Sequence, residues 1–115
     1  MTSNEGLLLL RQIESENLLK RLIDQINKDA DLAGLDLFIK DDISVEELVK
    51  SLYSNIYRLI TSNNESYLSF LYRVDIDENT IKNTHDKTVE QIAENSTYLI
   101  LKREWQKIYF RSKNL

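Results

Sequence analysis

The segment DKTVEQIAENSTYLILKREWQKIYFR, residues 86–111, decides the fold that we expect for this chain. It contains no Gly or Pro and is rich in apolar residues, which is the composition of a long helix. Asp86 is placed to cap its start, because a carboxylate there accepts hydrogen bonds from free backbone N–H groups. We therefore predict a helix from Asp86 to Arg111 on which the other elements pack.

The apolar residues of this helix occupy two different faces. At roughly 100° per residue, the second half of the helix presents an apolar face rotated by about 150° from that of the first half. The early face contains Val89, Ile92, Ala93, Leu99 and Ile100. The late face contains Tyr98, Leu101, Trp105, Ile108 and Tyr109. The pattern predicts either a kink or two different packing partners for one helix.

Composition favours a single helical domain that covers residues 1–115, with residues 1–5 disordered. The chain has 115 residues, with only two Gly and no Pro, so a β fold rich in turns is disfavoured. The fold class that we predict is all-α, an antiparallel bundle of four main helices. Residues 77–83 are a possible short extra helix. No internal repeat or interdomain linker interrupts the sequence.

Apolar periodicity places the remaining helices at residues 6–29, 45–61 and 65–74. Ser44 followed three positions later by Glu47 is a capping-box pattern, and Asn64 is placed to cap the helix after it. The segment 30–43 breaks the helical period, and Gly34 suits a helix end. It is too apolar for an exposed loop, so we expect it to lie against the core.

The chain has no Cys, which excludes disulfides, thiolate metal sites and a cysteine nucleophile. The N-terminal residues lack a basic region followed by an apolar core, so we expect no signal peptide. The apolar run Leu7 to Leu10 is far too short to span a bilayer. These features predict a cytoplasmic protein without a membrane segment.

One acidic stretch resembles the loop that binds calcium in EF-hand proteins. Asp75, Asp77, Asn79 and Asp86 have the spacing of oxygen ligands that wrap around the ion. However, Thr80 stands where the sharp turn needs glycine, and the last ligand is Asp rather than a bidentate Glu. We therefore favour a solvated loop with helix-capping carboxylates, and no metal or other cofactor.

His85 is the only His of the chain, and it stands beside Asp86. A catalytic His–Asp pair would need a nucleophile or a substrate placed by the fold, and no sequence pattern identifies one. We therefore interpret it as an exposed His before a helix and predict no catalytic residue.

The C-terminal end is basic and aromatic. Residues 87–115 carry more cations than carboxylates, whereas the whole chain has a net charge of −4. Lys102, Arg103, Lys107 and Arg111 are possible phosphate contacts, with neighbouring aromatic rings to stack on bases. The favoured alternative is that the aromatic residues belong to the core or to an interface and the cations solvate the other side.

The phrases LYRVDIDE (Leu71 to Glu78) and KREWQKIYFR (Lys102 to Arg111) resemble segments of small uncharacterised bacterial helical proteins. That resemblance implies an all-helical fold and carries no catalytic signature.

These patterns predict a non-enzymatic protein-interaction module, either a homodimer or a subunit that binds another protein. The late face would form the interface, because aromatic residues are enriched at interface centres. Alternatively, the apolar first helix covers this face, since Leu7, Leu10 and Leu18 lie outside its main stripe. The second candidate is a weak nucleic-acid-associated protein that uses the basic C-terminal end.

Overall fold

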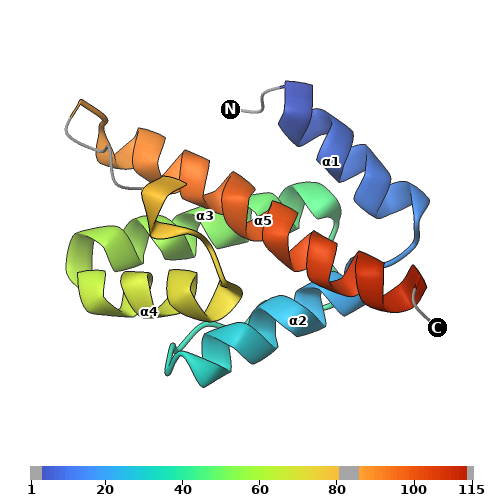
Figure 1. The fold of residues 1–115 in the computed structure, drawn as a ribbon, viewed down its shortest axis with the longest axis horizontal. Coiled ribbons are helices and arrows are strands. Elements are labelled where there is room, and N and C mark those ends of the chain that lie inside the picture. Colours follow the sequence, from blue (N-terminus) through green and yellow to red (C-terminus); the bar gives the residue numbers. More distant parts are fainter. Residues whose placement is uncertain (1–3, 81–85, 114–115) are drawn as a thin grey trace.

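A computed structural model of the chain describes residues 4–80 and 86–113. In these residues five α-helices and one short 3-10 turn enclose the core, and no strand is present. The helices are α1 (Asn4–Ser15), α2 (Leu19–Leu32), α3 (Val45–Ser62), α4 (Asn64–Val74) and α5 (Val89–Lys113), and the turn is η1 (Glu78–Thr80) (Figure 1). The all-α prediction is confirmed. None of the described helices has the length and apolar content needed to cross a membrane.

The N-terminal segment, which we predicted as one helix over residues 6–29, consists of two helices. Asn17 has a φ of 56°, in the left-handed region, and this residue separates α1 from α2. Asn tolerates that conformation better than most residues, because its short polar side chain can bond locally. The break lets Ile13 and Leu22 enter the same core from helices of different direction. The described residues therefore contain five main helices instead of the predicted four, and α1 begins at Asn4, within the segment expected to be disordered.

The start of α3 follows the predicted capping box. The backbone N–H of Glu47 donates to Ser44 Oγ at 3.1 Å, and the backbone N–H of Ser44 donates to Glu47 Oε1 at 3.1 Å. The cap of α4 is Asn63 and not Asn64, because Asn63 Oδ1 accepts from the N–H of Ser66 at 3.2 Å.

The cap of α5 also differs from the prediction. Thr88 Oγ1 accepts from the N–H of Gln91 at 3.1 Å, and Gln91 Oε1 accepts from the N–H of Thr88 at 2.9 Å. This reciprocal pair is a second capping box, so α5 begins at Val89 and Asp86 is an exposed residue before it. Two reciprocal bonds satisfy more of the free backbone groups than one carboxylate at Asp86 would.

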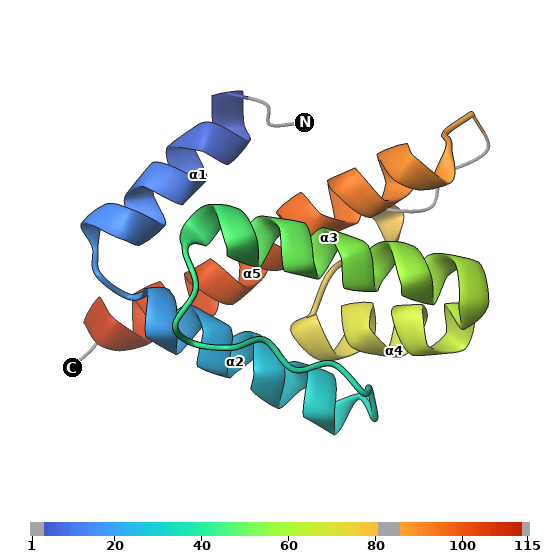
Figure 2. The same ribbon diagram turned by 180° about the vertical axis from the view of Figure 1, so that it is seen from behind.

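The connector between α2 and α3 lies against the core, as predicted. Leu37 and Ile39 are buried, whereas Phe38 between them is 79 % exposed, which is the alternation of an extended segment. The side chain of Asn27 holds this segment, since its amide accepts from the N–H of Ile39 and donates to its carbonyl, each at 2.8 Å. Figure 2 shows the connector running along α2.

The last helix is the centre of the bundle. It contacts all four other α-helices, and both views show it crossing α3 obliquely (Figures 1 and 2). Its C-terminal end lies beside the turn between α1 and α2, where Lys113 Nζ is 3.7 Å from a carboxylate oxygen of Glu16. Because α1, α2, α3 and α4 each contact α5, this helix connects the elements of the bundle.

The buried face of α5 is continuous and does not switch sides. Its buried residues recur every three to four positions: Ala93, Ser96, Thr97, Ile100, Leu101, Glu104, Trp105 and Ile108. Thr97 and Glu104 occupy the positions between the early and the late apolar faces. The two predicted faces are therefore the edges of one wide buried face. The apolar pattern suggested a switch only because polar residues fill part of this face.

Candidate functional site

A charged cluster is buried where α5 crosses α2. Asp29 from α2 is 4 % exposed, and Glu104 from α5 is 0 % exposed, although ionisable side chains are rarely buried so completely. Lys107 lies between them, with its Nζ 2.9 Å from Asp29 Oδ2 and 3.0 Å from Glu104 Oε1. Gln25 Nε2 also donates to Asp29 Oδ2, at 3.1 Å. The cluster thus joins two carboxyl groups to one ammonium group.

The two carboxyl groups of the cluster titrate differently. Burial raises the pKa of Glu104 to about 9, and the adjacent carboxylate of Asp29 adds to this effect. Burial also acts on Asp29, but hydrogen bonds from Glu104, Lys107 and Gln25 outweigh it and lower the pKa of that group. At neutral pH, Glu104 therefore holds a proton while Asp29 is ionised. With Lys107 charged, the cluster is electrically neutral.

The hydrogen bonding of Glu104 agrees with this proton. As a carboxylate, neither of its oxygens accepts a hydrogen bond of ordinary geometry from any of the described residues. Lys107 is close to Oε1, but it is better placed to donate to Asp29. A protonated Glu104 instead becomes a donor, and the ionised Asp29 beside it is the acceptor. The proton on Glu104 thus replaces the repulsion between two carboxylates with a hydrogen bond from Glu104 to Asp29.

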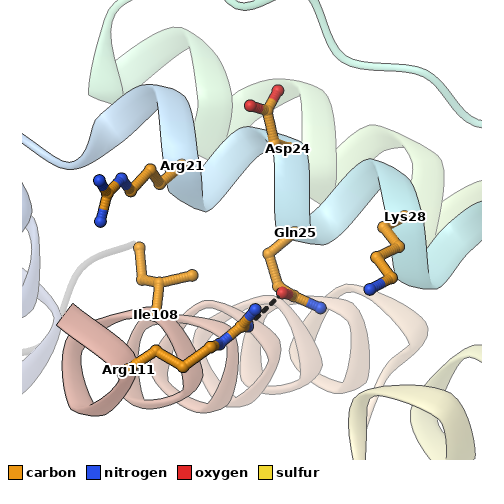
Figure 3. Close-up of a pocket in the computed structure, with 6 residues that line it drawn as sticks. All are labelled: Arg21, Asp24, Gln25, Lys28, Ile108 and Arg111. Carbon is orange, nitrogen blue, oxygen red and sulfur yellow. Dashed lines mark hydrogen bonds between the residues drawn. The ribbon is translucent and has the colours of Figure 1, made fainter. Parts of the chain in front are cut away.

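A hollow of about 350 Å³ opens beside this cluster, between α2 and the end of α5 (Figure 3). Its lining consists of Arg21, Asp24, Gln25, Lys28, Ile108 and Arg111. The guanidinium group of Arg111 donates to Gln25 Oε1. Because Gln25 also donates to Asp29, this one amide connects the wall of the hollow to the buried charges.

Most cations that we predicted as possible phosphate contacts are engaged within the chain. Arg103 Nη2 lies 3.1 Å from Asp75 Oδ2, Lys107 is part of the buried cluster, and Arg111 is bonded to Gln25. This arrangement supports the alternative that the cations stabilise the fold. Lys102 remains exposed.

Three residues of the predicted interface are covered by their own chain. Leu101, Trp105 and Ile108 are buried, and Tyr98 and Tyr109 are half-buried. The rings of Trp105 and Tyr109 pack with their centroids 5.6 Å apart, and both α1 and α2 contact α5. This burial agrees with the alternative that the N-terminal region covers the late face. Whether these residues also touch a second copy stays a prediction.

The acidic stretch after α4 has structural contacts. Asp75 ends α4 with a φ of 75° and pairs with Arg103, and Asp77 Oδ1 accepts from the N–H of Asn79 at 3.0 Å. In the described part of the chain, no group of three or more His, Cys, Asp or Glu side chains is arranged to hold a metal ion. His85 lies outside the described residues.

The sequence pattern does contain a signal for the cluster. Glu104 follows Ile100 and precedes Ile108 by four positions each, so its place on the apolar face could have identified it as buried. Gln25 and Asp29 have the same spacing on α2. That these residues meet across two helices depends on the crossing of α2 and α5, which periodicity does not reveal.

Several large apolar side chains remain exposed on the described surface. On α4, Leu68 is 47 % exposed and Tyr72 is 81 % exposed, one helical turn apart. The other face of α4 is buried and contains Tyr67, Phe70, Leu71 and Val74. The outer face of α4, by which we mean Leu68 and Tyr72, therefore has an apolar character that the chain's own core does not use.

The chain matches no protein-family model, and no curated protein or solved structure is significantly similar to it. Its function is therefore inferred from its own geometry.

Proposed function

We propose that this chain is a non-enzymatic, cytoplasmic helical module that binds another protein chain, most simply a second copy of itself. The supporting observation is the exposure of Leu68 and Tyr72 on the outer face of α4. Side chains four positions apart on a helix are neighbours, so these two form one small apolar patch.

The outer face of α4 suits an interface better than the late face of α5 does. Trp105 and its neighbours are already buried, and exposing them would unfold part of the core. Tyr is among the residues enriched at the energetic centres of interfaces, because its ring adds a large contact area at a small cost in side-chain entropy. Two-fold dimers are the commonest oligomers, so a second copy is the simplest partner.

Light scattering coupled to size-exclusion chromatography tests this proposal. We expect the parent chain to become dimeric as its concentration rises, and a variant with Leu68→Ser and Tyr72→Ser to remain a folded monomer. The matched control carries Leu7→Ser and Leu8→Ser, which remove two exposed apolar side chains from α1. This control should dimerise like the parent. A parent chain that stays monomeric at high concentration would refute a second copy as the partner. An α4 variant that still dimerises would refute the outer face of α4 as the interface.

A further inference from the structure

The hollow between α2 and α5 has the properties of an anion-binding site. Arg21 and Lys28 line it from α2, and Arg111 lines it from α5 (Figure 3). We propose that this hollow binds a small phosphorylated molecule that carries at least two negative charges. The binding site is separate from the outer face of α4, so the two proposals can fail independently.

The charge balance of the hollow is positive. Asp24 is the one carboxylate among its described lining residues, and Figure 3 shows this side chain directed away from α5. Its Oδ2 lies 3.0 Å from Lys20 Nζ, outside the hollow, so its charge is already compensated. Neither Arg21 nor Lys28 is within ion-pair distance of a carboxylate in the described parts of the chain. Three cations and one compensated carboxylate give the lining a net positive charge, which attracts anions.

The spacing of the cations fits a ligand with two anionic groups. Arg21, Gln25 and Lys28 are four and three positions apart, which places them on the same face of α2. With a rise of 1.5 Å per residue, the Cα atoms of Arg21 and Lys28 are about 10 Å apart along the helix axis. The guanidinium group of Arg111 contacts this face of α2 at Gln25, which lies between Arg21 and Lys28. The hollow therefore has two cations on its α2 wall and one on its α5 wall.

Arg111 is held in place before any ligand arrives. Its Nε donates to the carbonyl of Lys107 at 3.3 Å, and its guanidinium also donates to Gln25, which is itself fixed by Asp29. A guanidinium group has five N–H donors, so donors remain for a phosphate oxygen. A side chain that is already oriented loses less conformational entropy on binding.

Size and lining favour a small molecule over a nucleic acid. The volume of the hollow falls within the range of small-ligand pockets, and the buried Ile108 gives it an apolar surface for an organic part of the ligand. A nucleic-acid strand would need further free cations along α5. The next ones, Lys107 and Arg103, are paired with Asp29 and Asp75 inside the chain.

Titration calorimetry with inorganic pyrophosphate and inorganic phosphate, at about 0.15 M salt, tests the site. We expect saturable binding of pyrophosphate, and weaker binding of phosphate because it engages fewer cations. Arg21→Ala and Lys28→Ala should each weaken pyrophosphate binding by about tenfold, the loss of one charge-assisted contact. Both side chains are exposed, so both variants should fold, which circular dichroism checks.

Lys50→Ala is the matched control, since it removes one exposed cation from α3 and changes the net charge equally. It should leave pyrophosphate binding unchanged. Equal weakening in Lys50→Ala, or no weakening in the α2 variants, would show nonspecific attraction and overturn the proposal. A short single-stranded oligonucleotide provides the third comparison. If it binds as tightly as pyrophosphate and competes with it, the site serves nucleic acid and the small-molecule assignment is wrong.

Discussion

The two halves of α5 place polar groups in the core in different ways. In the early half, Tyr67 and Ser96 share a hydrogen bond of 2.6 Å between their hydroxyl groups, and Thr97 Oγ1 donates to the carbonyl of Ala93 at 2.7 Å. These groups are neutral. In the late half, Glu104 and Lys107 are ionisable and meet a third such group, Asp29, on α2.

The difference shows that a buried neutral hydroxyl and a buried charge need different partners. A neutral hydroxyl needs one nearby partner, and an unsatisfied one costs about 1–3 kcal/mol. A buried charge needs an opposite charge, and removing its partner costs about 3–5 kcal/mol. In the late half, the ammonium group of Lys107 compensates Asp29, and a proton neutralises Glu104. We therefore expect the late half, and not the early half, to make the stability of the protein depend on pH.

The largest expected effect comes from removing the cation of the cluster. Lys107→Met should lower the free energy of unfolding at pH 7 by about 3–5 kcal/mol, because Asp29 loses its opposite charge in a buried site. Urea denaturation measures this change. Lys102→Met is the matched control on the exposed side of α5, and it should change stability by less than about 0.5 kcal/mol. Equal effects of the two substitutions would contradict the buried cluster.

The second substitution, Glu104→Gln, should raise the free energy of unfolding instead of lowering it. Glu104 has a pKa near 4.5 in the unfolded chain and about 9 in the folded chain. Between these values the folded state binds more protons, so the contribution of Glu104 to stability falls as pH rises from about 4.5 to 9. Glu104→Gln needs no proton and can still donate to Asp29. We expect it to raise the free energy of unfolding by about 3 kcal/mol at pH 7.

Urea denaturation of the Glu104→Gln variant at several pH values checks this prediction. The parent should lose stability steadily between pH 5 and pH 9, whereas the variant should lose much less over this range. The two should converge in stability near pH 4.5, where the parent takes up its proton without cost. A Glu104→Gln variant less stable than the parent at pH 8 would indicate an ionised Glu104.

The smallest effect concerns the early half. Tyr67→Phe removes one hydroxyl and leaves that of Ser96 without its partner, which should lower the free energy of unfolding by about 1–2 kcal/mol. Burial raises the pKa of Tyr67, so its hydroxyl stays neutral across the ordinary pH range. Thermal unfolding at pH 5 and pH 8 should therefore show the same loss at both values. If the loss of stability in Tyr67→Phe changed with pH, the early half of α5 would also contribute to the pH dependence, and the predicted difference between the two halves would be wrong.

Local patterns predicted several elements correctly. The apolar stripe from Val45 onward and the capping box of Ser44 define α3, since both depend only on residues close in sequence. Thr88 and Gln91 form the same kind of capping box at the start of α5, so the prediction of Asp86 as the cap is wrong although the local signal is present in the sequence. Periodicity does not predict the break at Asn17, because a single residue with positive φ leaves no periodic signal.

The sequence by itself determined that this chain forms amphipathic helices with an apolar core, because periodicity and capping act within a few residues. Only the tertiary structure decided which polar residues enter that core and what they meet. Asp29 and Glu104 are ordinary surface residues by composition, and 75 positions separate them along the chain. Their burial, the proton that Glu104 holds and the hollow beside them all follow from the crossing of α2 and α5. That crossing depends on how every helix packs at once, which no local pattern specifies.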